Sequence, residues 1–272
     1  MKTTVTSWSF PQLSLQEIVG LAKVLGLGGV DVGYFYKSAL DRRAMISEPE
    51  KYAQSLMVLD HKFPCLYHLF GQDLYDRNMA DEDSLSDNMN DMRQVIRFCK
   101  YLGIEQIMVL PGMVAPGENR RQAFSKAVVN LKEIVPLVTE AGLTISVEPH
   151  VHGLLESPAL AQELVTEVDG LGLTLDYAHL ICLGFSQEEI DVLAPFATHI
   201  HLRQARPGRL QEKLDLGTIN FNAMLGLLKS LNYNDYVAYE YVHQAYMNTL
   251  YDDVITETIL MRDLVKAFNV MG

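Results

Sequence analysis

Four short apolar segments in the second half of the chain each carry a carboxylate or an imidazole near their end. The four residues, with the local sequence of each, are Glu148 in VEPH, Asp176 in LDYAH, His201 in HIHL and Glu240 in YEY. Charged groups that follow buried apolar residues need a partner, because an isolated buried charge is costly. A divalent cation balances carboxylates and accepts an imidazole nitrogen, and this mixed ligand set favours Mn2+, with Mg2+, Co2+ or Zn2+ as alternatives. The pattern predicts one divalent metal ion bound by these four residues.

Each of these residues, taken singly, has another explanation. Asp176 could cap the turn that follows it, His201 could be a hydrogen-bonded core histidine, and either glutamate could pair with an arginine. For all four together, that explanation requires buried arginine or lysine partners, and we expect these strands to supply none. The sequence therefore favours the metal site.

Parallel strands would bring the four residues to one place. Short runs rich in Val, Ile and Leu alternate with longer amphipathic stretches, which is typical of a parallel sheet with helices outside it. Each run is short and apolar, as a strand buried on both faces should be. The predicted strands are Thr3–Trp8, Gly29–Gly33, Phe63–Leu69, Gln106–Leu110, Leu143–Glu148, Leu171–Asp176, His199–Leu202 and Tyr236–Tyr241.

Apolar residues at three- and four-residue spacing predict the intervening helices. These are Leu15–Leu25, Glu48–Asp60, Ser84–Tyr101, Arg120–Ala141, Pro158–Val168, Gln187–Leu193, Phe221–Leu231 and Asp252–Phe268. No linker, low-complexity tract or strict repeat interrupts the alternation, so we expect an α/β fold with a single domain over residues 1–272, one (β/α)8 TIM barrel. In such a barrel the chemistry lies at the carboxyl ends of the strands.

The composition excludes several classes of protein. The net charge is -12 and the basic residues are scattered, which argues against binding to nucleic acid or to an anionic membrane. The three cysteines lie far apart, and no signal region or membrane-length apolar run occurs, so we expect a soluble cytoplasmic protein. The acidic stretch from Asp73 to Asp91 predicts a surface loop leading into a helix.

The chain resembles the xylose isomerase-like TIM barrel superfamily, which includes the sugar phosphate isomerase/epimerase family. The resemblance covers all eight predicted strands and rests on VEPH, LDYAH, HIHL and YEY in the expected order, with the glycine-containing segment LGTINF at Leu216–Phe221. It implies that the same four residues are the metal ligands and that His179 contacts substrate or steadies the site. It also implies a small sugar as substrate and a homo-oligomeric assembly.

These residues suit proton transfer on carbon. Two carboxylates, Glu148 and Glu240, can remove a proton beside a carbonyl and return one from the opposite face, through a metal-bound enediolate. We therefore expect a metal-dependent sugar isomerase or epimerase that acts on a monosaccharide or a related polyhydroxy ketone.

One segment departs from the commoner pattern of this superfamily. An acidic residue often follows the ligand histidine, but this chain has Arg203 and Gln204 there. The next loop carries Arg206 and Arg209, which could grip substrate. Both of them, and Arg203, could equally be solvated loop charges. The residues that we predict to bind substrate are His68, at the end of the third strand, His179 and Arg206.

Three other functions were weighed against this one, and the third of them is disfavoured by the sequence. A lyase or dehydratase acting on a keto-sugar or an inosose would use the same enolisation chemistry. A non-catalytic sugar-binding barrel would not need a paired acid and base. A nuclease resembling endonuclease IV would need more histidines at the rim, yet none occurs between His68 and His150, and the acidic charge also argues against it.

Overall fold

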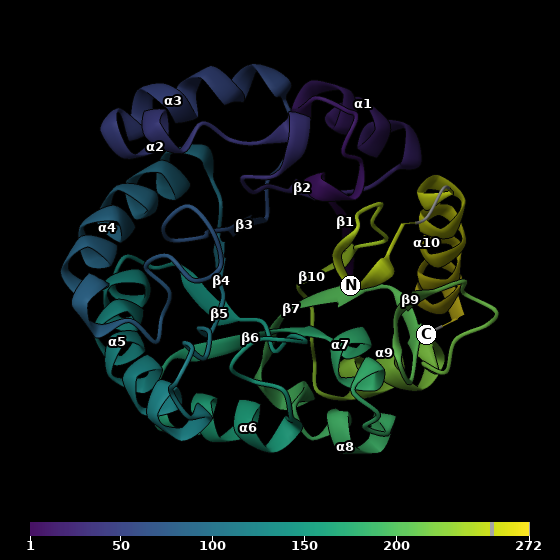
Figure 1. The fold of residues 1–272 in the computed structure, drawn as a ribbon. Helices are drawn as coiled ribbons and strands as arrows, with labels where there is room; N and C mark the ends of the chain where they lie inside the picture. Colours follow the sequence, from purple (N-terminus) through teal and green to yellow (C-terminus); the bar gives the residue numbers. More distant parts are fainter. Residues whose placement is uncertain (251–252, 272) are drawn as a thin grey trace.

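Eight parallel strands form the core of the protein in this computed structural model, which describes residues 1–250 and 253–271. Figure 1 shows them at the centre of a ring of helices. The strands are β1 (Lys2–Thr6), β2 (Gly29–Asp31), β3 (Cys65–Tyr67), β4 (Gln106–Val109), β5 (Thr144–Val147), β6 (Leu171–Asp176), β7 (Ala197–Leu202) and β10 (Tyr236–Tyr239). β6 has the predicted bounds, β7 begins two residues earlier than predicted, and the other six strands are shorter than predicted, differences that are usual at element ends.

The sheet order β2-β1-β10-β7-β6-β5-β4-β3 is that of a barrel opened at one seam. A parallel bridge between Val32 and Leu66 joins the two end strands. Around it, the Val32 amide donates to the Cys65 carbonyl at 3.0 Å, and the Tyr67 amide donates to the Val32 carbonyl at 2.8 Å. The predicted (β/α)8 TIM barrel is confirmed.

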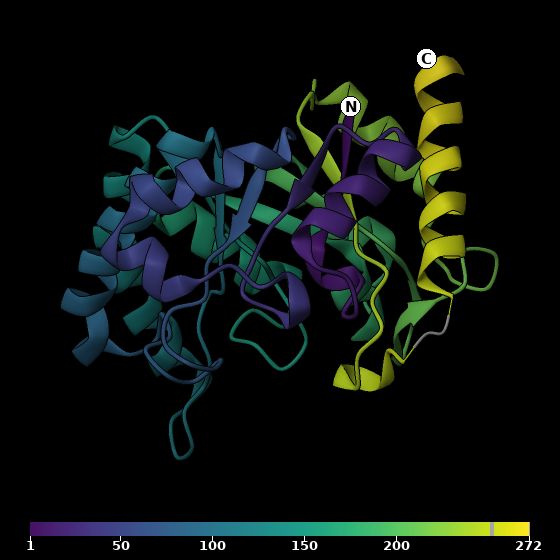
Figure 2. The same cartoon turned by 90° about the horizontal axis from the view of Figure 1, so that it is seen from above.

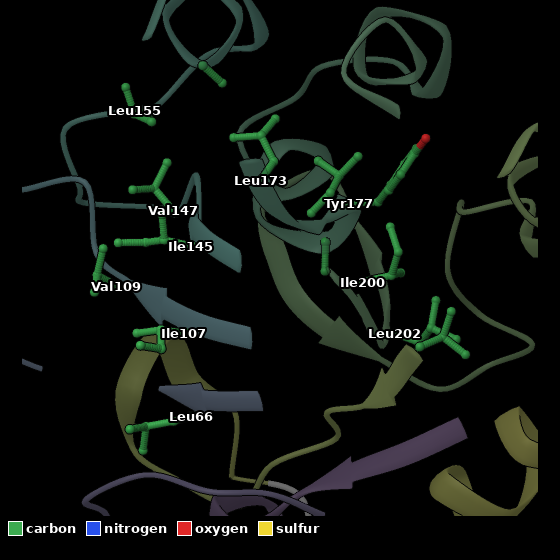
Figure 3. Close-up of a cluster of buried hydrophobic side chains, with 14 of the residues drawn as sticks. Leu66, Ile107, Val109, Ile145, Val147, Leu155, Leu173, Tyr177, Ile200 and Leu202 are labelled. Atoms are coloured by element: carbon green, nitrogen blue, oxygen red, sulfur yellow. The ribbon is translucent and has the colours of Figure 1, made fainter. Parts of the chain in front are cut away.

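Alternate residues of each strand face opposite sides of the barrel wall, because side chains alternate along a strand. The outward set packs under the helices in one large apolar cluster (Figure 3). It includes Ile107, Val109, Ile145, Val147, Leu173, Ile200 and Leu202. The inward set is more polar: Gln106 Nε2 donates to Ser146 Oγ at 2.6 Å, and Ser146 Oγ lies 2.7 Å from Thr174 Oγ1. Polar side chains inside the barrel thus lie below the carboxyl ends of the strands.

The principal helices follow the predicted pattern. They are α1 (Leu15–Leu25), α3 (Pro49–Leu56), α4 (Leu85–Leu102), α5 (Arg120–Glu140), α6 (Pro158–Glu167), α8 (Gln187–Asp191), α9 (Phe221–Ser230) and α10 (Val254–Met271). Two shorter helices, α2 (Arg42–Ser47) and α7 (Tyr177–Cys182), are additional to the prediction. Asp252, the predicted start of the last helix, lies outside the described residues.

A small antiparallel hairpin, β8 (Gln204–Arg206) and β9 (Arg209–Glu212), follows β7 and was not predicted. Gln204 fixes the segment behind it: its Oε1 accepts from the Ile219 amide at 3.0 Å, and its Nε2 donates to the Leu214 carbonyl at 3.2 Å. A side chain at Gly217 would meet Gln204 Cγ at 2.2 Å, so only glycine fits there. Gln204 is therefore a structural clamp.

The chain termini lie at one end of the barrel in Figure 2, and the loops that follow the strands extend from the other end. The acidic stretch forms a loop that leads into α4, as predicted. None of the described helices combines the length and the apolar character needed to cross a membrane.

Candidate metal centre and cavity

The four predicted ligands project from the carboxyl ends of four neighbouring strands. Glu148 directly follows β5, Asp176 ends β6, His201 lies in β7 and Glu240 directly follows β10. Asp176 and His201 are register partners, and the Glu240 amide donates to the Leu202 carbonyl at 3.0 Å. All four are buried, with exposed fractions of 6% or less. The barrel register therefore brings them together.

The His201 ring lies between the two glutamates. Its Nδ1 is 2.8 Å from Glu148 Oε1 and 3.2 Å from Glu240 Oε2. One ligand atom from each of the three residues lies within 4.8 Å of the others, which suits a shared cation. Glu240 Oε2 is buried without a hydrogen-bond partner, so a cation would satisfy it. This donor set, two carboxylates and an imidazole, fits a divalent metal ion.

Asp176 has a different environment. It groups with Glu148 and His179, whose potential ligand atoms also lie within 4.8 Å of one another. Its Oδ1 accepts from the Ala178 amide at 2.8 Å and so caps α7. Its Oδ2 accepts from Arg203 Nε at 2.9 Å and lies 2.7 Å from Arg203 Nη2. Asp176 therefore combines the capping role with an ion pair, and it lies beside the other three predicted metal ligands.

The expectation that these strands supply no buried cationic partner was wrong. Arg203 is 4% exposed and pairs with Asp176 inside the barrel mouth. It stands two residues after His201, so the alternation of β7 continues into it and directs its side chain inward. That spacing was readable in the sequence, but we had assigned Arg203 to the loop.

The two glutamates around His201 favour positive charge on its ring. Burial alone would lower the pKa of His201, but Glu240 and Glu148 outweigh it and raise that pKa well above its usual value. Burial raises the pKa of Glu240, yet His201 and Arg203 together hold it below its usual value. Burial raises the pKa of Asp176 to about 6 against the pull of Arg203.

A cavity of about 250 Å³ opens above these residues. Its lining combines polar groups with aromatic and aliphatic walls: Trp8, Phe35, Tyr36, Tyr67, Leu74, Leu110, Glu148, His150, His179, Arg203, Glu240, Gln244 and Tyr246. Trp8 packs edge-on against Phe35 and Tyr67, at ring-centroid distances of 5.9 and 5.6 Å. The Trp8 indole also donates to Glu240 Oε1 at 2.6 Å. The aromatic wall is thus hydrogen-bonded to a predicted catalytic carboxylate.

Of the three predicted substrate-binding residues, His179 lines this cavity and the other two do not. His68 accepts or donates a hydrogen bond with the Tyr34 hydroxyl at 2.7 Å and packs against Phe70. Arg206 is partly exposed on the hairpin, where its Nε donates to Glu212 Oε2 at 3.0 Å. The structure gives neither His68 nor Arg206 a place beside the four carboxylate and imidazole residues.

Several lining residues had no predicted contact with substrate. The Nδ1 of His150 donates to the Val151 carbonyl at 2.6 Å, and its Nε2 is buried without a partner. Tyr246 and Gln244 come from the loop after β10, and no periodic pattern marks that loop. Among these three residues, only His150 lies in a segment that the sequence analysis singled out, VEPH.

Comparisons with known proteins agree with this architecture. The model of the family described as "Xylose isomerase-like TIM barrel" matches residues 19–258. An inosose isomerase of Bacillus licheniformis is 24% identical over 190 residues, which cover 65% of this chain and 68% of that protein.

Two solved structures share the fold over nearly the whole chain. The IOLI protein with a binding zinc atom has a TM-score of 0.75 at 19% identity, covering 98% of this chain and 99% of that one. An L-ribulose 3-epimerase has a TM-score of 0.77 at 16% identity, covering 98% and 94% respectively.

Proposed function

The chain belongs to the xylose isomerase-like TIM barrel family, and on this premise we propose that it is a metal-dependent isomerase or epimerase of a small polyhydroxy ketone. The observation that carries the proposal is the pair of buried carboxylates, Glu148 and Glu240, that meet at His201 Nδ1 and both line the cavity. A site that only binds sugar has no need of two such carboxylates in one buried position.

In the proposed reaction, Glu148 and Glu240 are the acid and base. One carboxylate takes a proton from the carbon beside the carbonyl, and the other returns a proton. Return to the opposite face of the same carbon gives an epimer. Return to the neighbouring carbon, with transfer of a hydroxyl proton, gives an isomer.

The residues proposed to hold the metal are Glu148, His201, Glu240 and Asp176. When bound, the divalent cation would polarise the carbonyl and offset the negative charge that develops on its oxygen. We propose Mn2+ as the first ion to test, because carboxylate-rich sites with one imidazole accept it readily. Trp8 would hold Glu240 in position through its indole hydrogen bond.

The proposed substrate is a sugar or inosose with a polar edge and an apolar face. Trp8, Phe35 and Tyr67 form an aromatic wall of the cavity beside the carboxylates, which suits the carbon face of such a molecule. The sequence similarity to an inosose isomerase supports testing inososes early. The buried free cysteines, Cys65, Cys99 and Cys182, support a reducing compartment such as the cytoplasm.

The test is hydrogen exchange on carbon. Metal-loaded protein is incubated in deuterium oxide with ketoses, aldoses, inososes and keto-glycosides, and NMR follows the loss of carbon-bound hydrogen. We expect exchange with at least one compound, and we expect Glu148→Gln and Glu240→Gln to abolish it. Glu163→Gln, on the outer face of α6 and paired with Arg121, is the matched control.

The outcomes separate the alternatives. Exchange coupled to loss of a hydroxyl group would assign a lyase or dehydratase to the same site. A protein that binds one metal ion per chain but exchanges no compound would contradict the proposal and favour a sugar-binding barrel.

A further inference from the structure

Arg203 is the only lysine or arginine among the described residues that line the cavity. Its Nε and Nη2 hold Asp176 Oδ2, and its Nη2 also lies 3.5 Å from Glu240 Oε2. Within the described residues, its Nη1 makes no hydrogen bond. A guanidinium that is 4% exposed, lines a cavity and keeps an uncommitted donor is suited to bind a ligand oxygen.

The contact between Arg203 and His179 points to the same conclusion. The Val151 amide donates to His179 Nδ1 at 3.2 Å, and Arg203 Nη2 lies 2.7 Å from His179 Nε2. The Val151 amide and the Arg203 guanidinium can only donate hydrogen bonds. A histidine ring, neutral or protonated, also carries a hydrogen on at least one of its two nitrogens. At least one of the two contacts therefore sets a donor against a donor.

An acceptor from outside the chain would resolve this mismatch. With Nδ1 accepting from Val151, both Nε2 of His179 and the guanidinium of Arg203 present hydrogens toward the cavity. Asp176 Oδ2 lies 3.6 Å from His179 Nε2, which is beyond hydrogen-bond distance, and it already accepts from Arg203. One ligand oxygen that accepts from both His179 and Arg203 would satisfy the two buried donors. Among oxygen acceptors, a carboxylate binds such a pair most strongly, since its charge matches that of the guanidinium.

The formal charges of the site permit an anion there. Glu148, Asp176 and Glu240 contribute three negative charges, and Arg203 contributes one positive charge. A divalent cation would bring the sum to zero. Without Arg203, the same centre would be negative and would repel an anionic substrate.

We propose that Arg203 and His179 form a subsite for a carboxylate, so that the substrate is an acidic polyhydroxy ketone. This inference rests on the proposed function for the identity of the reacting group. The carboxylate would be held next to the reacting carbons, because Arg203 contacts Asp176 and Glu240 themselves. The aromatic wall that contains Trp8 and Tyr67 carries no positive group.

The test measures binding, which requires no turnover. Isothermal titration calorimetry on the metal-loaded protein compares three pairs that differ in a carboxylate: glycolate with ethylene glycol, D-glucuronate with D-glucose, and D-gluconate with D-glucitol. We expect at least one acid to bind ten or more times more tightly than its uncharged partner, on the order expected for a charge-assisted contact.

Three variants assign that preference. Arg203→Met should remove it, while Arg203→Lys should keep part of it, because the charge remains without the planar fork. Arg97→Met is the matched control, since Arg97 is also ion-paired but lies on the outer surface with Glu50. Metal content is measured for each variant, so that a lost ion is not mistaken for a lost subsite.

Two results would overturn the inference: no acid is preferred by the unmodified protein, or the preference survives in Arg203→Met. Failure of the proposed function appears differently, as absence of hydrogen exchange. Exchange on neutral ketoses without any preference for acids would keep the function and remove the subsite. A preference for acids that depends on Arg203, with no hydrogen exchange on any compound, would keep the subsite and remove the proposed function.

Discussion

The two sides of the cavity differ in chemistry although the same barrel builds both. The side formed by the ends of β5, β6, β7 and β10 carries Glu148, Asp176, His201, Arg203 and Glu240. The side formed by β1 to β4 and their loops carries the aromatic and aliphatic side chains except Tyr246, which follows β10. Under the proposed function, the first side would perform the proton transfer, and the second would give the cavity its shape and exclude water.

The division predicts that substitutions on the polar side affect turnover and metal binding, and that substitutions on the apolar side affect fit or stability. The contact from Trp8 to Glu240 is where the two sides meet. The following experiments test this division in order of expected effect.

His201→Asn should have the largest effect. The imidazole contacts both glutamates, so its loss leaves two buried carboxylates without their shared partner. Residues behind a metal ligand typically contribute about 10–100-fold in metal affinity, and we expect a ligand to exceed that range. Metal titration and hydrogen exchange measure both losses. His61→Asn, remote from the cavity, is the control, and retention of metal by His201→Asn would contradict the assignment.

His68→Gln should change stability and its pH dependence. Burial, reinforced by Arg42 and Arg77, lowers the pKa of His68 to about 3. The unfolded chain therefore binds a proton near pH 6.5 that the folded chain does not, so stability falls as pH drops below about 6.5. Between pH 7 and pH 5 this group should account for about 2 kcal/mol.

Urea denaturation at the two pH values measures this contribution. The loss of unfolding free energy on acidification should be smaller in His68→Gln than in the unmodified protein. Equal losses would show that His68 is protonated in the folded state, or that it is exposed to solvent. The KM of the variant tests separately whether His68 contacts substrate.

Trp8→Phe tests the contact between the two sides. The change keeps most of the aromatic wall but removes the hydrogen bond to Glu240 Oε1. A hydrogen bond to a charged group contributes about 1.5–3 kcal/mol, so kcat/KM should fall by roughly 10- to 100-fold. Because the indole bond favours the ionised carboxylate, the acidic limb of the pH profile should move to higher pH. Phe35→Leu, which changes the wall alone, should raise KM without moving that limb.

Arg206→Ala should have the smallest effect. Arg206 is a partly exposed hairpin residue paired with Glu212, and exposed ion pairs contribute about 0–1 kcal/mol. We expect less than about a twofold change in the dissociation constant of any acid that binds, against the larger loss in Arg203→Met. A tenfold loss in Arg206→Ala would move the anion subsite to the hairpin and reverse the comparison of the two arginines.

The contrast between these arginines shows where sequence reasoning stopped. Strand alternation predicts inward side chains at His199, His201 and Arg203, but the predicted strand ends at Leu202, as β7 does, and Arg203 lies one residue beyond that end. Strand ends are the least certain part of such a prediction, because hydrogen bonding to neighbours decides them. Arg206 was preferred for its loop position. Pro207 and Gly208 mark a turn after it, but nothing in the sequence indicates that Arg206 pairs with Glu212.

The sequence by itself determined the barrel and the predicted metal-binding quartet. Period-two apolar strands and period-three-to-four helices depend on local patterns, and the four polar residues end strands that a parallel barrel must align. Only the tertiary structure decided the rest: which side chains line the cavity, the pairing of Arg203 with Asp176, and the separation of His68 and Arg206 from it. Those features depend on contacts between residues distant in the chain, and local periodicity carries no information about them.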